Sequence, residues 1–203
     1  EPTHYGADVC VGSLIKNPGG GLAPTGGYMA GRKDLIERIS YRLTAPSVGL
    51  EIGSYAAGYQ LFYQGLFMAP HVVAQAVKTA ILAAAVFADF GMKTTPDVNA
   101  QRTDIIQALE MGTPERLVAF CQGIQAASPV DSMAVPEPWD MPGYQEQVIM
   151  AAGTFVSGAS IELSADAPMR EPYTVYLQGG LTYSHGKLAL IRTLETMQQQ
   201  GLL

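Results

Sequence analysis

The segment that decides the fold spans Gly12 to Gly21 and reads GSLIKNPGGG. It contains one lysine, Lys16, directly after the apolar run from Ala7 to Ile15. A strand that buries both of its faces has a nearly continuous apolar sequence, so we expect a strand over 7–15 with Lys16 at the mouth of a cavity. Asn17–Pro18 ends this strand because proline cannot donate to a sheet ladder, and the glycines that follow allow close approach to the main chain.

A lysine at the edge of an apolar site has a clear chemical use. Burial disfavours the charged form of an amine, and a neutral amine can attack a carbonyl carbon to form a Schiff base. Ser13, three residues before Lys16, offers a hydroxyl that could bind a phosphate. The alternative is a lysine that extends into solvent at a strand end, with the Ser13 hydroxyl bonded to its own backbone.

Residues 13–28, SLIKNPGGGLAPTGGY, closely resemble the lysine segment of a pyridoxal-phosphate family. Its members are known as aluminium resistance proteins, or as methionine gamma-lyase-like and cystathionine beta-lyase-like proteins. The resemblance spans nearly the whole chain, since it continues through 42–46, 153–155, 170–173 and 178–183. It implies an α/β protein with the aspartate-aminotransferase fold (fold type I).

The resemblance also implies roles for three residues. Lys16 would be the Schiff-base lysine that carries pyridoxal 5'-phosphate and then moves the α-proton of the substrate. Ser13 would contact the cofactor phosphate. Arg170 would bind the substrate carboxylate, since a planar guanidinium can donate two parallel hydrogen bonds to it. The alternative for Arg170 is a salt bridge to Asp166 or Glu171.

The implied activity is that of a carbon–sulfur lyase of the methionine gamma-lyase or cystathionine beta-lyase type, acting on a sulfur-containing amino acid. A homodimer or homotetramer with an active site shared between subunits is implied as well. Two alternatives stay open. The chain could be a catalytically silent module of the same fold that binds a metabolite or phosphate, or a piece that mainly builds a subunit interface.

The same resemblance implies the domain organisation. Residues 1–95 would be the end of the large cofactor-binding domain with its connecting helices, and residues 96–203 the small C-terminal α/β domain. We expect the chain to be the C-terminal part of a larger enzyme, because the family has a comparable length of chain before Glu1. The family's phosphate loop, stacking aromatic ring and pyridine-nitrogen aspartate come from that part, so we expect the fragment alone to be inactive.

Composition restricts the other classes of function. The chain has 203 residues, 48% of them hydrophobic, and a formal net charge of −6, which argues against nucleic-acid binding. Cys10 and Cys121 are interpreted as buried thiols in a reducing compartment, so we expect a cytoplasmic protein without disulfides. The three histidines are scattered, so no metal site is predicted. The apolar stretch 70–90 has an uncharged run too short for a span of about 20 residues, so no membrane segment is expected.

Periodicity and turn residues predict the remaining elements. Strands are expected at 27–31, 102–110, 147–151, 160–163 and 174–177, and helices at 32–42, 54–67, 70–90, 113–127 and 182–200. Pro70 is placed in a first helical turn, where its missing N–H is tolerated. The aromatic helix 54–67 is expected to pack in the core or against a subunit, with a tyrosine over the cofactor as the alternative. Ser47 lies in an irregular segment, 43–53, where the family pattern has glycine.

Overall fold

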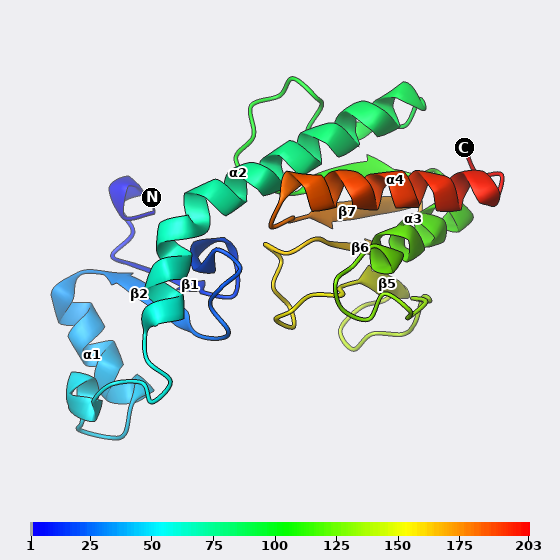
Figure 1. Ribbon diagram of the computed structural model, residues 1–203. Coiled ribbons are helices and arrows are strands. Elements are labelled where there is room, and N and C mark those ends of the chain that lie inside the picture. Colours follow the sequence, from blue (N-terminus) through cyan, green and yellow to red (C-terminus); the bar gives the residue numbers. More distant parts are fainter. Residues whose placement is uncertain (1) are drawn as a thin grey trace.

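A long helix, α2 (Gln60–Asp89), connects two groups of elements in the computed structural model, which describes residues 2–203 (Figure 1). One group contains a two-stranded antiparallel sheet, and the other contains a five-stranded antiparallel sheet. The mixed α/β class is therefore as predicted.

The first group begins with the hairpin of β1 (Val9–Ser13) and β2 (Gly27–Gly31), in which Ser13 lies opposite Gly27. The short helix η2 (Asn17–Gly19) lies in the loop between the two strands. Helix α1 (Lys33–Leu43) and the short helix η3 (Gly49–Ile52) follow. The predicted strand, loop, strand and helix are confirmed, with boundaries that differ by at most two residues.

The expectation that β1 is buried on both faces is wrong for this chain. None of its residues is fully buried, and Val11 is 67% exposed. The reason is that β1 has β2 as its sheet partner along one edge only. Its thiol, Cys10, is accordingly only partly buried, whereas Cys121 is buried as predicted and both thiols are free.

The prediction of two helices, at 54–67 and 70–90, is wrong, because the structure has one continuous helix, α2. The helix begins at Gln60, continues through Pro70 and bends along its length (Figure 1). Proline inside a helix removes a hydrogen bond and costs about 3 kcal/mol. Packed small residues on both sides of Pro70, including Gly65, Ala69 and Ala76, offset that cost.

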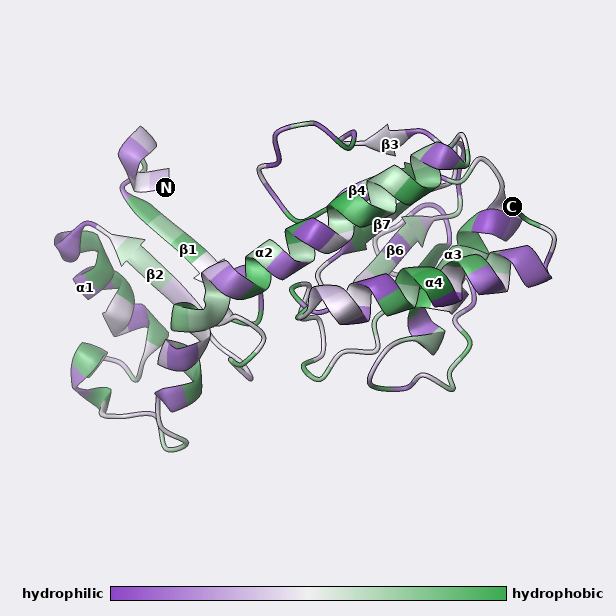
Figure 2. Cartoon of the chain, turned by 45° about the horizontal axis from the view of Figure 1, so that its top comes forward, coloured by the Kyte–Doolittle hydropathy of each residue, from purple (hydrophilic) through white to green (hydrophobic). Residues whose placement is uncertain are grey.

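Helix α2 is long and apolar enough to cross a membrane by length and composition (Figure 2). Its C-terminal half nevertheless lies in the protein core, where Ala76, Ala83 and Phe87 are fully buried. We therefore interpret it as a core helix.

The second group is built on a sheet with the strand order β3-β4-β7-β6-β5. The strands are β3 (Thr94–Thr95), β4 (Gln107–Glu110), β5 (Val148–Ala151), β6 (Ser164–Pro168) and β7 (Thr174–Gln178). The sheet thus begins at Thr94, and the proposed division of the chain into 1–95 and 96–203 stays a prediction.

The predicted strand at 160–163 is wrong, because β6 begins only at Ser164. The preceding residues form a turn in which the Glu162 N–H donates to the Ala159 carbonyl at 3.0 Å. Ile161 and Leu163 are buried in this turn, and their spacing imitates the alternation of a strand. The predicted strand 102–110 is likewise shortened to its last four residues, Gln107–Glu110.

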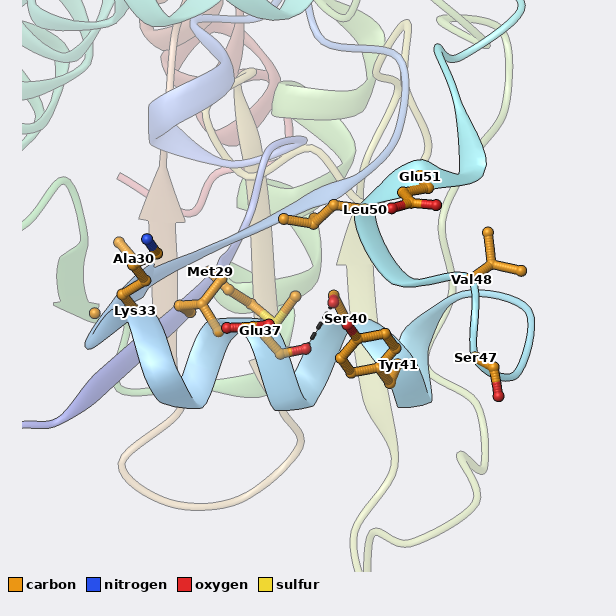
Figure 3. Close-up of a pocket in the computed structure, with 12 residues that line it drawn as sticks. Met29, Ala30, Lys33, Glu37, Ser40, Tyr41, Ser47, Val48, Leu50 and Glu51 are labelled. Carbon is orange, nitrogen blue, oxygen red and sulfur yellow. Dashed lines mark hydrogen bonds between the residues drawn. The ribbon is translucent and has the colours of Figure 1, made fainter.

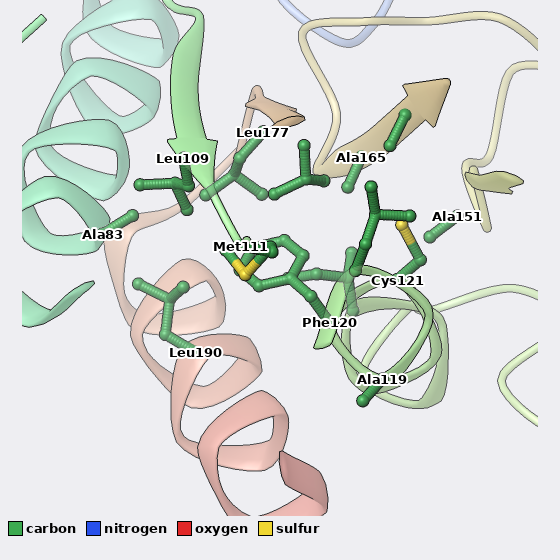
Figure 4. Close-up of a cluster of buried hydrophobic side chains, with 14 of the residues drawn as sticks. Ala83, Leu109, Met111, Ala119, Phe120, Cys121, Ala151, Ala165, Leu177 and Leu190 are labelled. Carbon is green, nitrogen blue, oxygen red and sulfur yellow. The ribbon is translucent and has the colours of Figure 1, made fainter. Parts of the chain in front are cut away.

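Helices α3 (Pro114–Ala126) and α4 (Tyr183–Gln199) pack on one face of this sheet together with the end of α2 (Figures 1 and 4). Both are confirmed within one residue at each end, and each is capped by a threonine hydroxyl that accepts a backbone N–H bond. Their shared core includes Phe87 and Phe120, whose rings are 5.3 Å apart between centroids. The helices leave the opposite face of the sheet open toward the first group.

Candidate active site

Lys16 lies where the two groups of elements meet. It follows the end of β1 and caps η2 in an extended backbone conformation. Its Nζ donates a hydrogen bond to the carbonyl oxygen of Gly158, which belongs to the second group. Within residues 2–203 the Lys16 amine forms no ion pair. It is therefore a partly buried amine with a neutral partner.

The loop after Lys16 is fixed by close packing on α2. Gly20 has a φ of 56°, in the left-handed region that favours glycine. A Cβ atom at Gly65 of α2 would collide with the carbonyl oxygen of Gly19, and one at Gly20 would collide with the carbonyl oxygen of Gly65. The glycines therefore bring the loop backbone against the helix backbone and set the position of Lys16.

Two cavities meet at Lys16. One has a volume of about 280 Å³ and extends over the open face of β6, and the other has a volume of about 510 Å³ and includes Ser13. Ser160 and Gln178 line both cavities together with Lys16. The structure therefore brings the predicted Ser13 and Lys16 to one cavity.

Arg170 is not part of this arrangement. It lies exposed in the turn between β6 and β7 and lines neither Lys16 cavity. Its side chain forms no ion pair with Asp166 or Glu171 in the described part of the chain. The structure thus separates Arg170 from Lys16, and its role as a carboxylate ligand stays a prediction.

Glu162 lines neither cavity at Lys16 but supports the loop beside it, and the sequence analysis missed it. Its side chain is only 3% exposed, and it accepts hydrogen bonds from the backbone N–H groups of Phe155 and Val156 at 2.8 and 3.1 Å. These bonds fix the loop that presents the Gly158 carbonyl to Lys16. A signal was present in the sequence, since Glu162 is a lone charge in the apolar stretch that was assigned to a strand.

Asp166 and Gln178 were missed as well. Both line the smaller cavity with Lys16, and burial raises the pKa of the Asp166 carboxyl group above its usual value. Both residues lie on the open face of the sheet, at positions that alternate with core residues such as Ala165 and Leu177.

The aromatic residues before and within α2 occupy a different place. Tyr55, Tyr59, Phe62 and Tyr63 form a cluster of ring contacts and line a cavity of about 440 Å³. None of these four side chains lines either cavity at Lys16. The three tyrosines are exposed, so in this chain the cluster is not a core.

The largest of the cavities described here, of about 650 Å³, lies between β2, α1 and η3 (Figure 3). Its polar lining includes Lys33, Glu37 and Ser40, and the Ser40 hydroxyl is occupied by a bond to the Glu37 carbonyl at 2.7 Å. Neither Lys16 nor Ser13 lines it. The larger cavity also offers an amine, hydroxyls and carboxyl groups, but the smaller cavities are the ones that contain the predicted residues Lys16 and Ser13.

The residues at Lys16 fit a cofactor that carries an aldehyde and a phosphate. A primary amine without an ion-pair partner suits bonding to the aldehyde, and the Ser13 hydroxyl in the same cavity suits the phosphate. Tyr28 also lines this cavity, and burial raises the pKa of its phenol, so Tyr28 favours the neutral form.

Comparison with known proteins identifies the family. The model of the methionine gamma-lyase family matches residues 1–198. The chain is 52% identical over all 203 residues to the uncharacterized protein YnbB of Bacillus subtilis, and covers 48% of that protein. It is 48% identical over 190 residues to an uncharacterized 33.9 kDa protein of Lactobacillus delbrueckii, of which it covers 62%.

Two solved structures are similar over 97% of the chain. One is a candidate cystathionine beta-lyase involved in aluminium resistance from Listeria monocytogenes, with 54% identity and a TM-score of 0.93. The other is a carbon–sulfur lyase involved in aluminium resistance from Clostridium novyi, with 52% identity and a TM-score of 0.90. The chain spans 48% and 46% of these two structures, about half of each. By the match of nearly its whole length, the chain belongs to the methionine gamma-lyase family.

Proposed function

We propose that the chain is part of a fold-type I lyase that cleaves a carbon–sulfur bond of an amino acid with pyridoxal phosphate bound at Lys16. The observation that carries this proposal is the Lys16 amine, held by the Gly158 carbonyl where two cavities meet. Membership of the methionine gamma-lyase family and the similarity to a structure described as a carbon–sulfur lyase support it.

Bound pyridoxal phosphate supplies an electron sink for the negative charge that forms when the substrate loses its α-proton. Lys16 would hold the cofactor in the resting protein through its Nζ. Once an amino-acid substrate has released it, the Lys16 Nζ would take the proton from the substrate α-carbon. The Gly158 carbonyl orients that amine, because it accepts a hydrogen bond from it. The same amine can then donate a proton to the departing sulfur.

Ser13 and Arg170 complete the proposal. The Ser13 hydroxyl donates to the cofactor phosphate. Arg170 binds the substrate carboxylate in the assembled enzyme. In this chain Arg170 is exposed. Arg170 lines neither Lys16 cavity of this chain, so we propose that it serves a site completed by another subunit.

The proposed assembly is a homodimer or homotetramer. Exposed apolar side chains on α2 support it, since Tyr63 and Phe67 are 71% and 82% exposed. Single apolar residues on a surface are common, but a neighbouring group of them marks an interaction site. Sedimentation of the full-length protein tests this part of the proposal, and a monomer at micromolar concentration would contradict it.

The experiment for the activity uses the full-length protein supplied with pyridoxal phosphate. We expect release of a thiol and a keto acid from at least one thioether amino acid, and loss of that release in Lys16→Ala. Lys33→Ala is the matched control, since Lys33 lines neither cavity at Lys16. Turnover that survives in Lys16→Ala would contradict the proposal.

A further inference from the structure

The loop between β5 and β6 (yellow in Figure 1) presents the Gly158 carbonyl that accepts the hydrogen bond from the Lys16 amine. No helix or strand lies between Ala151 and Ser164, so the shape of this loop depends on turns and side-chain contacts. Backbone bonds within two turns give the loop its local shape. The contacts that attach these turns to the sheet therefore decide where the Lys16 amine lies.

The Glu162 side chain attaches the loop to the sheet. One of its carboxylate oxygens accepts the N–H of Phe155 at 2.8 Å, and the other accepts the N–H of Val156 at 3.1 Å. Hydrogen bonds to an ionised group are about twice as strong as those between neutral groups. Glu162 precedes β6, which begins at Ser164, by two residues. Its two bonds therefore tie the far end of the loop to the beginning of a strand.

The backbone of Glu162 is itself fixed by the residues that follow β7. Gly179 has a φ of 78°, and a Cβ atom there would collide with the carbonyl oxygen of Glu162. The N–H of Gly180 donates to the carbonyl oxygen of Ile161 at 2.9 Å. The end of β7 thus holds the Glu162 backbone closely, and the Glu162 carboxylate transmits the position of the sheet to the loop.

Glu162 acts from outside the cavities at Lys16. It lines neither of them, but it lines a separate cavity of about 320 Å³ with Thr182 and His185. A continuous series of contacts nevertheless connects its carboxylate, through the loop, to the Gly158 carbonyl and the Lys16 amine. Each of these contacts is made within residues 2–203, so the connection does not depend on any group that this chain lacks.

We propose that Glu162 is a positioning residue for the Lys16 amine, an inference that rests on the proposed function. Glu162 touches neither substrate nor cofactor. It holds the Gly158 carbonyl in the place where that oxygen accepts a hydrogen bond from Nζ, and this bond orients the free amine toward the substrate α-carbon. Precise orientation matters, because a shift of a reacting group by about 1 Å can slow a reaction about a hundredfold.

The first test uses Glu162→Gln in the full-length protein supplied with pyridoxal phosphate. Glutamine has the same length, but it keeps only one acceptor oxygen and turns an NH2 group toward the second N–H. We expect kcat for exchange of the L-alanine α-proton with deuterium oxide to fall about tenfold or more, while KM and the cofactor trapped at Lys16 stay unchanged. A loss of bound cofactor with unchanged kcat per loaded site would be a structural defect only, and would overturn the inference.

The second test needs no cofactor. The full-length protein, freed of pyridoxal phosphate, is labelled with acetic anhydride and mapped by mass spectrometry. An amine that is bonded to a carbonyl must leave it before it reacts, so we expect labelling of Lys16 relative to Lys33 to rise about fivefold in Glu162→Gln. An unchanged labelling ratio in a folded Glu162→Gln protein would overturn the inference.

Two control variants should keep the wild-type labelling ratio. Glu110→Gln removes a carboxylate of the same sheet that pairs with Lys93 at 2.7 Å and lies outside both cavities at Lys16. Met197→Ala removes a fully buried side chain near the end of α4, and so tests whether a general loss of stability alone changes the reactivity of Lys16. A rise in Met197→Ala equal to that in Glu162→Gln would overturn the inference.

Hydrogen exchange of the wild-type protein does not depend on the folding of any variant. The N–H groups of Phe155 and Val156 should exchange about tenfold more slowly than that of Ser157, which has no hydrogen-bond acceptor within residues 2–203. Equal exchange of all three would overturn the inference.

These measurements separate the inference from the proposed function. Thioether cleavage by the wild-type protein, together with unchanged Lys16 labelling in Glu162→Gln, overturns the role of Glu162 and leaves the lyase intact. Increased Lys16 labelling in Glu162→Gln, together with a wild-type protein that cleaves no thioether, supports the role of Glu162 and contradicts the lyase.

Discussion

Ser47 has a backbone conformation that favours glycine. Its φ is 67°, in the left-handed region, where a side chain costs about 1–2 kcal/mol. The sequence analysis expected glycine here from the family pattern, and the positive φ gives a physical reason for that expectation.

We expect Ser47→Gly to stabilise the protein by about 0.5–1 kcal/mol, because the relief of strain exceeds the entropy that glycine adds to the unfolded chain. Urea unfolding measures the change. Ser47→Ala is the matched control and should show no such gain, since alanine has the same Cβ atom as serine. A Ser47→Gly protein no more stable than the alanine variant would contradict the strain at this residue.

The raised pKa of Asp166 predicts how the stability of the folded protein depends on pH. Because burial raises its pKa in the folded protein, the folded state binds the proton more tightly than the unfolded state does. Ionisation of Asp166 therefore costs stability as the pH rises through the raised pKa. Below the usual value of about 3.9 both states are protonated and this cost vanishes.

We expect Asp166→Asn to be more stable than the wild-type protein at pH 7 and 8, with a difference that shrinks as the pH falls toward 4. Urea unfolding of both proteins over this pH range tests the sign. A difference that stays constant with pH, or that grows on acidification, would show that Asp166 is not held at a raised pKa.

The residues of the site differ in how far the sequence could predict them. The position of Lys16 and Ser13 at a strand end was predictable, because an apolar run that ends in lysine and Asn17–Pro18 indicates such an end, whereas their roles came from the family resemblance and stay predictions. Asp166 was not, because the small residues around it in β6 give no clear hydrophobic alternation. Glu162 was not predicted either, because its apolar neighbours alternate as in a strand and led to the prediction of a strand there.

At the scale of the elements, helix α2 shows where local rules give the wrong result. Pro70 indicates the beginning of a helix, and the structure has it in the interior. A proline in a helix interior destabilises only the turn around it. The packing of α2 on the glycine loop and on the five-stranded sheet outweighs this local cost. A single sequence does not show such contacts, so α1, α3 and α4 were predicted well and α2 was not.

The contact between α2 and the glycine loop gives a prediction for Gly65. Alanine in place of glycine in a helix normally stabilises it by up to about 1 kcal/mol. At Gly65 the new Cβ atom would collide with the Gly19 carbonyl, so we expect a loss of about 1–3 kcal/mol instead. Thermal unfolding measures the sign.

The control for Gly65 is Gln64→Ala, an exposed neighbour in the same helix that should change stability little. Since the loop positions Lys16, Gly65→Ala should also weaken covalent binding of the cofactor at Lys16. A Gly65→Ala protein with increased stability would mean that the loop does not pack on α2 in this way.

At the scale of the whole molecule, the site lies between parts of the chain that are far apart in sequence. Lys16 contacts Gly158, which is 142 positions away. Sequence periodicity predicts helices and strands, but it contains no information about the contact between Lys16 and Gly158. The sequence could therefore place Lys16 at the end of a strand, but only the structure shows that the opposite wall comes from the loop before β6.

The central claim is that Lys16 bonds covalently to pyridoxal phosphate, and reductive trapping tests it most directly. The full-length protein is incubated with pyridoxal phosphate, reduced with borohydride, digested and mapped by mass spectrometry. The account predicts one reduced adduct on the peptide that contains Lys16, present in Lys33→Arg and absent in Lys16→Arg. No adduct, or an adduct on another lysine that persists in Lys16→Arg, would contradict it.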